Sequence, residues 1–403
     1  MAIRLPVLHA FASRDFRLLW SGQTVSMIGD AAFFVALGWT TFKLEGSGAL
    51  GVVLMLQAVG MLATLLVGGA LADRYPRRAL MIGSDLARAA LVGVLAGLDF
   101  GGGLSIELLA TVALLQGLAG GFFVPAFGGI VPLVVEQPQL ASANALIGIS
   151  RQFSLIIGPA FAGLVYGATG SATVFAFDAG SFVFSAALVW LAQPRAIMPA
   201  EREGALREIG AGIRYVASDP WLWITIALFS VFLMVVLAPY QVLMPSIIQN
   251  QFGRGVGSYG LLMTFQGAGM VVGTVLFGQL NPRRRRGLLS YLLWTVNSAL
   301  VVVLALAPWY ELAAASAALR GAAVGFGIGV WETMLMELVP GHLLSRVISV
   351  DYFGSLGLMP VGLVLAGAAS ALASPQALLA GGGVLGALIF AAGLTKKEIR
   401  TIQ

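Results

Sequence analysis

The stretch Gly69-Ala-Leu-Ala-Asp73-Arg74-Tyr-Pro-Arg77-Arg78 sets four charged residues between two long apolar runs, residues 48–72 and 79–98. Each run holds the roughly 20 mostly apolar residues that a helix needs to cross the hydrocarbon core of a bilayer. A helix satisfies its own backbone polar groups, which lipid cannot do. The charged stretch is therefore interpreted as a short polar turn between two membrane-spanning helices.

The composition extends this interpretation to the whole chain. Hydrophobic residues make up 59% of the 403 residues and charged residues only 10%, whereas a soluble domain carries about a quarter charged residues. Most of the surface must therefore face lipid. Cysteine is absent, which excludes disulfides, thiolate metal sites and thiol nucleophiles. The net charge is +5, but the basic residues lie between apolar runs rather than on a soluble face. No nucleic-acid partner is therefore expected.

Twelve runs have the length and apolarity of spanning helices, which predicts an all-α membrane protein with twelve transmembrane helices. They cover residues 17–42, 48–72, 79–98, 105–134, 141–167, 172–192, 221–247, 257–280, 287–307, 311–339, 345–369 and 375–395. The long polar connection 193–220 separates two predicted six-helix bundles, residues 1–192 and 221–403. Within it Leu206, Ile209, Ile213 and Val216 share one helical face, which predicts an amphipathic helix on the membrane surface.

The distribution of Lys and Arg predicts the orientation. Eighteen of these residues lie in the two terminal segments and the connections expected on the same side, against only Lys43 and Arg254 on the other side. By the positive-inside rule, both termini are expected in the cytoplasm. The N-terminal residues lack the pattern of a cleavable signal peptide. We therefore expect a multi-pass protein of the inner (cytoplasmic) membrane.

The two predicted halves repeat one another. Leu115-Gln-Gly-Leu-Ala-Gly-Gly-Phe122 matches Leu319-Arg-Gly-Ala-Ala-Val-Gly-Phe326 at five of eight positions, 204 residues further on. Gly69 with its basic run is followed 209 residues later by Gly278 with Arg283 to Arg286, and the fifth and eleventh runs each contain a proline, Pro159 and Pro360. Duplicated halves around a central site are the design of many secondary transporters.

These motifs resemble the major facilitator superfamily, whose signature loop joins helices two and three. Within it, three stretches resemble the exporter branch that includes macrolide and siderophore efflux proteins: Arg14-Asp-Phe-Arg-Leu-Leu-Trp20 running into Ile28-Gly-Asp30, Ile157-Gly-Pro159-Ala-Phe-Ala-Gly163, and Trp331-Glu-Thr to Val339-Pro340. The resemblance implies the major facilitator fold of two pseudo-symmetric six-helix bundles. Two departures stand out. Asn281 and Pro282 replace the acid in the second loop, and Ala113 replaces the fourth-helix Arg of proton-coupled relatives.

The resemblance also implies gating and bending residues. The signature-loop residues Gly69, Asp73, Arg74, Arg77 and Arg78 are expected to gate the cytoplasmic side, with Asp73 at the N-terminal end of the eleventh helix near Ser345 and Arg346. A helix N-terminus stabilises a carboxylate, although anchoring of the arginines to anionic headgroups is an equal alternative for them. Asp351 is assigned to the inner gate. Gly158, Pro159 and Gly163 resemble the antiporter motif of helix five and, with Pro360, are expected to bend helices.

Ionisable groups within spans cost about 2.5–3.5 kcal/mol each on insertion scales, so they are candidates for function. Gln23, Ser26 and Asp30 share one face of the first span, a polar stripe suited to a cavity wall. Asp30 is the first candidate for binding a proton or cation. Glu332 is the second proton-coupling candidate.

The remaining charges within spans are interpreted mainly as structural. Arg151 has Asp30 or a residue of the other half as its expected partner. Arg151 and Arg320 are interpreted first as partners of acids and second as substrate ligands. Asp178 is interpreted as a structural acid, and Asp85 with Arg88 as a local ion pair at i, i+3 near the cytoplasmic interface.

The expected function is alternating-access export of an amphipathic small molecule by proton antiport. The chain has no Walker loop, and His9 and His342 lack metal-ligand spacing, so neither a cofactor, a metal site nor catalysis is expected. The expected partners are the substrate, protons and the lipid bilayer, and the expected state is a monomer. A siderophore or lysolipid carrier of the same fold, or a non-transporting receptor or scaffold, remain alternatives.

Overall fold

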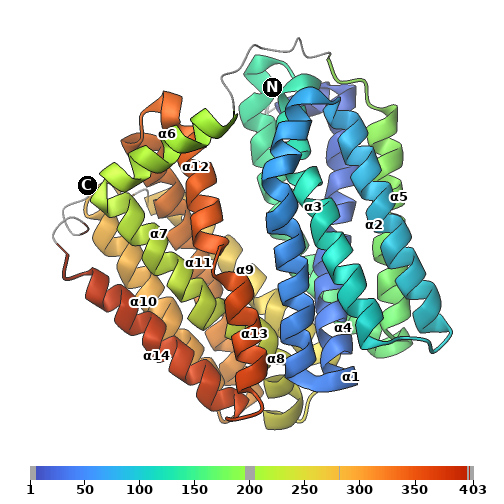
Figure 1. The fold of residues 1–403 in the computed structure, drawn as a ribbon, viewed down its shortest axis with the longest axis vertical. Helices are drawn as coiled ribbons and strands as arrows, with labels where there is room; N and C mark the ends of the chain where they lie inside the picture. The colour runs from blue at the N-terminus through green and yellow to red at the C-terminus, as the bar shows by residue number, and fades with distance from the viewer. Residues whose placement is uncertain (1–5, 196–204, 281, 397–398, 400–403) are drawn as a thin grey trace, which may run out of the picture. The chain divides into compact units, whose positions relative to one another are not determined.

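The computed structural model describes residues 6–195, 205–280, 282–396 and 399. Within these ranges the side chains of Pro6, Val7, Leu66, Ala70, Asp73, residues 205–209 and His342 are not described. Every regular element of the described residues is a helix (Figure 1). The predicted all-α membrane class is confirmed.

The first structural unit comprises Met1–Leu44 and Leu56–Glu201. Its elements are the short helix η1 (Pro6–Ala12), most of α1 (Arg14–Arg74), α2 (Arg77–Phe100), α3 (Ile106–Val134), η2 (Gln137–Gln139), α4 (Leu140–Thr169) and α5 (Ser171–Leu191). Helix α1 has 61 residues and would be about 90 Å long if straight, three times the thickness of a bilayer core. Its backbone leaves helical geometry at Glu45 and Gly46, so α1 consists of two successive spanning helices.

The second unit comprises Glu45–Met55 and Arg202–Gln403. Its helices are α6 (Ala205–Ser218), α7 (Pro220–Phe232), α8 (Ala238–Ser246), α9 (Val256–Leu280), α10 (Arg286–Ala305), α11 (Tyr310–Leu338), α12 (Gly341–Leu356), α13 (Met359–Ala369) and α14 (Pro375–Gly393). A π-helical turn, Leu233–Leu237, joins α7 to α8. Among the described residues, eleven helical stretches are long and apolar enough to span a membrane. Since the first contains both parts of α1, each predicted span has a helical counterpart.

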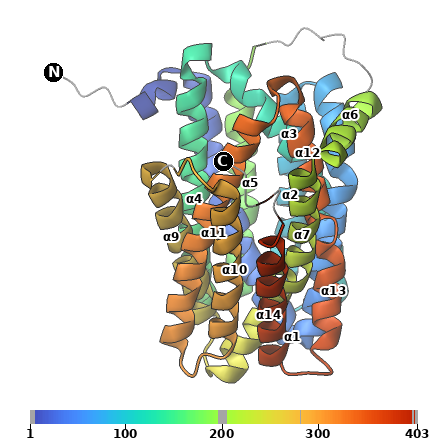
Figure 2. The same cartoon turned by 90° about the vertical axis from the view of Figure 1, so that its left-hand side faces the viewer.

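Helix α6 is the amphipathic helix expected in the connection, but its apolar face is partly covered by protein. It packs against α12 in both views (Figures 1 and 2). Val216 is buried beside Val347, and Gly212 lies against the backbone of Arg346. Ile213 is exposed, and the side chains of Leu206 and Ile209 lie outside the described ones. At Val216 the apolar face therefore packs on protein, while the location of the helix at the membrane surface stays a prediction.

Glycine contacts give the internal repeat a structural reason. A Cβ atom on Gly117 of α3 would lie 2.1 Å from the backbone oxygen of Gln57 in α1, and one on Gly321 of α11 would lie 2.0 Å from that of Gln266 in α9. Both glycines therefore allow two backbones to approach closely, which is how small residues act in membrane helix packing. The matching octapeptides form the same kind of helix contact in each half.

A glycine contact of the same kind explains why part of α1 belongs to the second unit. Gly51 lies against α13, where an added Cβ would come within 2.5 Å of the Leu363 carbonyl oxygen and 3.1 Å of Gly367 Cα. The turn that precedes this segment uses Gly46 at φ 77°, a left-handed conformation that glycine adopts without a steric penalty.

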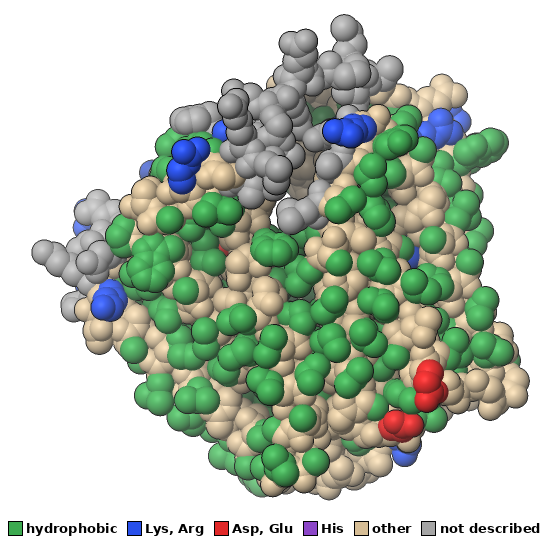
Figure 3. All heavy atoms as spheres, viewed as in Figure 1, with side chains coloured by type: hydrophobic (Ala, Val, Ile, Leu, Met, Phe, Trp, Pro, Cys, Tyr) green, Lys and Arg blue, Asp and Glu red, His purple; other side chains and the backbone are tan. Residues whose placement is uncertain are grey.

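The outward surface is apolar. Leu164, Trp190 and Leu372 are 75%, 65% and 90% exposed. In the face shown in Figure 3 hydrophobic side chains are spread over the helices, while few charged ones are visible. An apolar surface of this extent would drive association in water. Lipid is its natural solvent.

Candidate functional site

Three carboxylates and one guanidinium meet inside the first unit, and we call Asp30, Asp85, Asp178 and Arg88 the acid cluster. Arg88 Nη2 donates to Asp85 Oδ1 at 2.5 Å, and its Nη1 lies 3.6 Å from Asp30 Oδ2. Asp178 on α5 is within electrostatic range of the other members. Helices α1, α2 and α5 each contribute to the cluster. It is not arranged as a metal site in the described residues.

Aromatic rings hold the guanidinium of Arg88 in place. Its Cζ lies 4.5 Å from the ring centroid of Phe123 and 4.2 Å from that of Phe182, a geometry in which the ring faces attract the cation. The predicted Asp85–Arg88 ion pair is confirmed. The pair is enclosed by protein, because Asp85 is fully buried and Arg88 is 6% exposed, while its place near the cytoplasmic interface stays a prediction.

The polar stripe of the first span does not form a cavity wall as expected. Gln23 and Ser26 are buried, and only Asp30, whose side chain is 50% exposed, meets solvent-accessible space. Gln23 Nε2 donates to Ser185 Oγ at 2.7 Å, and Ser185 donates to Asp85 Oδ2 at 2.7 Å. The stripe thus connects α1 to the acid cluster through α5.

Asp178 differs from a simple structural acid. It is fully buried, and Ser181 is its hydroxyl donor, at 3.4 Å from Oδ1. Its Oδ2 accepts no hydrogen bond in the described structure. Gly29 of α1 makes this approach possible, because a Cβ there would lie 2.5 Å from Asp178 Oδ1. A buried carboxyl oxygen without a donor is costly when ionised.

Arg151 does not meet Asp30, contrary to one of its two expected pairings. The cation beside Asp30 is Arg88, whereas Arg151 is exposed on α4 and is in no ion pair with the described carboxylates. The sequence predicts Asp85 as the partner of Arg88, and the packing of α2 near α1 brings the same guanidinium to Asp30 as well.

Arg320 is a buried cation with neutral partners. Its side chain is 2% exposed, its Nη1 donates to Gln266 Oε1 at 2.8 Å, and the hydroxyl of Tyr240 donates to the same oxygen at 2.7 Å. The guanidinium lies 4.0 Å from the Tyr240 ring centroid, and Nε has no partner. No described carboxylate pairs with it, which contradicts the first interpretation of Arg320 as the partner of an acid.

The signature loop is tied to its own bundle. Arg77 donates to the backbone oxygen of Gly129 on α3 and Arg78 to that of Trp190 on α5. Gly69 has open space around it, Arg74 is exposed, and the side chain of Asp73 lies outside the described ones. These contacts tie Arg77 and Arg78 to backbone oxygens of their own bundle, while gating by the loop and anchoring to headgroups both stay predictions.

The loop of the second half uses an arginine in the same way. Arg286, 209 residues after Arg77, donates its Nε to the backbone oxygen of Pro282 and pairs with Glu337. Glu337 on α11 therefore supplies an acid contact that the loop sequence itself lacks.

The predicted helix bends differ from one another. Helix α4 continues through Pro159, with Gly158 packed against Ala31 of α1 and Gly163 buried. By contrast, α12 ends at Leu356 and α13 begins at Met359, one residue before Pro360, which cannot donate a backbone hydrogen bond. A role for either proline in movement stays a prediction.

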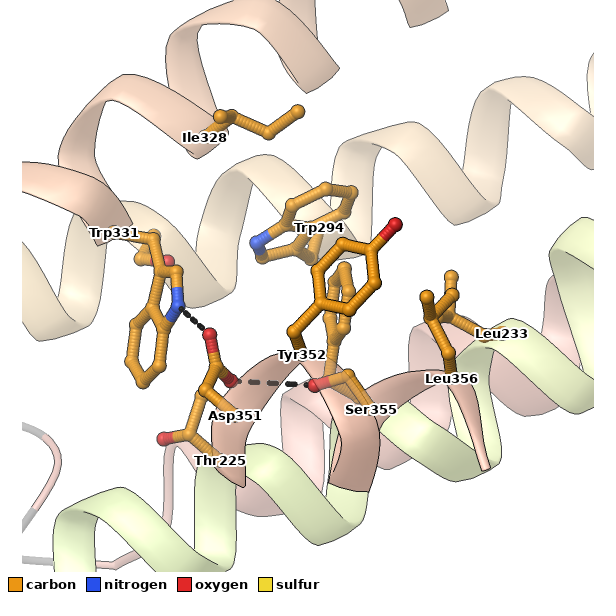
Figure 4. Close-up of a pocket in the computed structure, with 11 residues that line it drawn as sticks. Thr225, Leu233, Trp294, Ile328, Trp331, Asp351, Tyr352, Ser355 and Leu356 are labelled. Atoms are coloured by element: carbon orange, nitrogen blue, oxygen red, sulfur yellow. Dashed lines mark hydrogen bonds between the residues drawn. The ribbon is translucent and has the colours of Figure 1, made fainter. Parts of the chain in front are cut away.

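A cavity of about 200 Å³ lies within the second unit, between α7, α10, α11 and α12 (Figure 4). Its lining includes Asp351, whose carboxylate accepts hydrogen bonds from Trp331 Nε1 at 3.0 Å and Ser355 Oγ at 3.3 Å. Glu332, the next residue after Trp331, is exposed and does not line it. The sequence predicts a gate role for Asp351 but does not reveal this cavity, because its walls come from helices far apart in the chain.

A sequence profile described as a transmembrane secretion effector matches residues 7–401 of the chain. The chain belongs to the transmembrane secretion effector family of the major facilitator superfamily. It is therefore a transporter rather than an enzyme, and a multi-pass membrane protein of a secretion and efflux family. The match covers both repeats, so the family assignment applies to the whole transporter.

Two curated relatives are exporters by name. The chain is 25% identical over 358 residues to macrolide efflux protein A of Streptococcus pyogenes, covering 87% of this chain and 88% of that one. It is 30% identical over 380 residues to the enterobactin exporter EntS of Shigella boydii, covering 90% and 89%.

Solved structures confirm the fold. A bacterial homologue of the human lysosomal transporter Spinster superposes with a TM-score of 0.69 at 14% identity, covering 99% of this chain and 94% of that one. A bacterial homologue of the iron transporter ferroportin superposes with a TM-score of 0.75 at 15% identity, covering 95% and 99%. The major facilitator fold expected from the sequence is thereby confirmed.

Proposed function

We propose that the protein exports an amphipathic small molecule across the cytoplasmic membrane by alternating access, driven by protons moving inward, and that Asp30 carries the proton. The family and its exporting relatives support the direction of transport. The acid cluster supports the coupling. It is the single observation on which the proton step rests.

Charge balance in the acid cluster favours proton binding. With all three carboxylates ionised, Arg88 balances one of the three negative charges and two are left without a cation. Unpaired charge is costly in buried surroundings. Asp30 is the most accessible member, because its side chain is half exposed while those of Asp85 and Asp178 are fully buried. Asp178, whose Oδ2 accepts no hydrogen bond, is costly to ionise and would already hold a proton, which leaves Asp30 as the accessible carboxylate that can bind and release one.

Neutralising Asp30 changes the pairing of Arg88. The 3.6 Å contact between them loses its electrostatic attraction, and Arg88 then pairs with Asp85 alone. Because these groups sit on α1 and α2, the protonation state of Asp30 changes the attraction between those helices. The proton therefore binds with different affinity to two arrangements of α1 and α2. A ligand can shift a conformational equilibrium only if its affinity for the two states differs.

The test is transport into everted membrane vesicles with an imposed pH gradient, using a macrolide and enterobactin as separate substrates. Wild-type protein is expected to accumulate a substrate only with the gradient, and Asp30→Asn to fall to the level of vesicles without the protein. Asp99→Asn is the matched control, since Asp99 bonds Ser171 outside the acid cluster. Wild-type transport that ignores the gradient rules out antiport, and wild-type rates in Asp30→Asn remove that residue from the mechanism.

A second candidate within the same family is a siderophore exporter, favoured by the 30% identity to the enterobactin exporter. The same vesicles separate the two candidates, because gradient-driven uptake of enterobactin without uptake of the macrolide selects the siderophore function.

A further inference from the structure

The cavity of the second unit joins one carboxylate to a set of aromatic rings. Asp351 is the charged residue among its described lining residues, and Phe229, Trp294, Trp331 and Tyr352 supply the rings. The lining residues that the structure describes include no lysine or arginine. The cavity is therefore negative in formal charge and rich in π faces.

Asp351 retains capacity to accept further hydrogen bonds. Its two described hydrogen bonds come from Trp331 and Ser355, both neutral donors, one to each carboxylate oxygen. A carboxylate accepts about four hydrogen bonds. Within the described part of the chain no arginine, lysine or histidine pairs with it, so the strongest type of partner for a carboxylate, a cation, is missing from its surroundings.

The cavity is also polar at one end and aliphatic at the other. Figure 4 shows Asp351 beside Trp331, with Trp294 and Tyr352 next to them and Leu233 and Leu356 on the far side. Aromatic faces attract ammonium groups, and aromatic cages are the usual receptors of quaternary ammonium ligands. The aliphatic end suits a hydrocarbon group attached to such a cation.

We propose that this cavity binds an organic cation, a protonated or quaternary amine on an apolar group, with the ammonium at Asp351 and the apolar group toward Leu233 and Leu356. The inference rests on the proposed function, because it names a substrate class for the exporter. At about 200 Å³, the cavity is smaller than the roughly 300–1,000 Å³ of pockets for drug-sized ligands. It therefore receives the amine-bearing end of a larger molecule.

The test measures equilibrium binding of radiolabelled benzyltrimethylammonium to the full-length protein in lipid nanodiscs, with benzylsulfonate as the probe of opposite charge. Wild-type protein is expected to bind the cation saturably and more tightly than the sulfonate. Asp351→Asn is expected to weaken cation binding about tenfold, because the quaternary ammonium loses its coulombic attraction to the carboxylate, and Asp351→Glu is expected to retain most of the binding. The matched control Glu311→Gln removes an exposed acid that pairs with Arg254 and is expected to bind as wild type.

A second variant protects the test against misfolding of Asp351→Asn. Tyr352→Leu removes an exposed ring from the cavity lining and is expected to weaken cation binding about threefold, the usual size of a cation–π contact at an exposed site. The proposal is overturned by the absence of saturable cation binding, by tighter binding of the sulfonate, or by wild-type affinity in a folded Asp351→Asn protein.

The binding experiment and the transport experiment can contradict the two proposals independently. If Asp351→Asn binds the cation as wild type does while vesicles still export a substrate with the pH gradient, the cation site is wrong and the exporter stands. If cation binding depends on Asp351 but vesicles transport neither a macrolide nor enterobactin, the proposed function is wrong and the binding site stands.

Discussion

Arg88 is the residue on which the acid cluster depends. Its guanidinium pairs with Asp85 and Asp30 and lies between the rings of Phe123 and Phe182. Breaking a buried ion pair by removing one partner costs about 3–5 kcal/mol, because it leaves an uncompensated charge. The position of this one cation therefore determines how much negative charge the helices around it tolerate.

Arg88→Gln is expected to lower the unfolding temperature of the purified protein at pH 7.5. The gap from wild type is expected to narrow at pH 5, because protonated carboxylates no longer need a cation. Thermal unfolding of both proteins at the two pH values measures this. Arg254→Gln, which breaks an exposed ion pair with Glu311, is the control and is expected to cost at most about 1 kcal/mol. A gap that stays constant or widens on acidification contradicts the prediction.

At the scale of elements, close helix contacts replace the hydrophobic effect that stabilises soluble cores. Lipid is as apolar as a leucine side chain, so membrane helices associate through packing and hydrogen bonds. The contacts of α3 with α1 and of α11 with α9 each use glycines, at Gly117 and Gly321. The glycines that would weaken helices in water are what let these helices pack.

Gly117→Ala is expected to destabilise the protein by about 1–3 kcal/mol, the usual cost of overpacking, because the new Cβ would lie 2.1 Å from the Gln57 backbone oxygen. Gly120→Ala on the same helix has open space around its Cβ and is expected to be neutral or slightly stabilising, since alanine favours helix. Unfolding temperatures in detergent compare the two variants. Equal losses of stability would show that the close contact does not matter.

At the scale of the whole molecule, the predicted orientation in the membrane can be measured directly by cysteine labelling. The chain has no cysteine, so a single introduced cysteine is the only one that reacts. Arg254→Cys is expected to react with a membrane-impermeant maleimide in intact cells, because it lies on the side with few basic residues. Arg284→Cys is expected to react only after the cells are permeabilised, as the positive-inside rule requires. Labelling of Arg284→Cys in intact cells would reverse the orientation.

The pairing within the acid cluster could be predicted from the sequence only in part. Each of its members is an ionisable group in a span, a signal that was visible in the sequence, yet only one pairing, at i, i+3 on α2, was set by local geometry. The contact of Arg88 with Asp30 joins residues 58 positions apart, and depends on how α2 packs near α1.

The sequence by itself determined the membrane class, the twelve spans, the repeat and the family, because hydrophobic length, charge spacing and glycine position act locally along the chain. Only the tertiary structure showed which charged side chains pair, that Val216 packs against α12, and that a cavity lies at Asp351. These depend on side chains from different helices meeting at hydrogen-bonding distance, which periodicity along one helix does not specify.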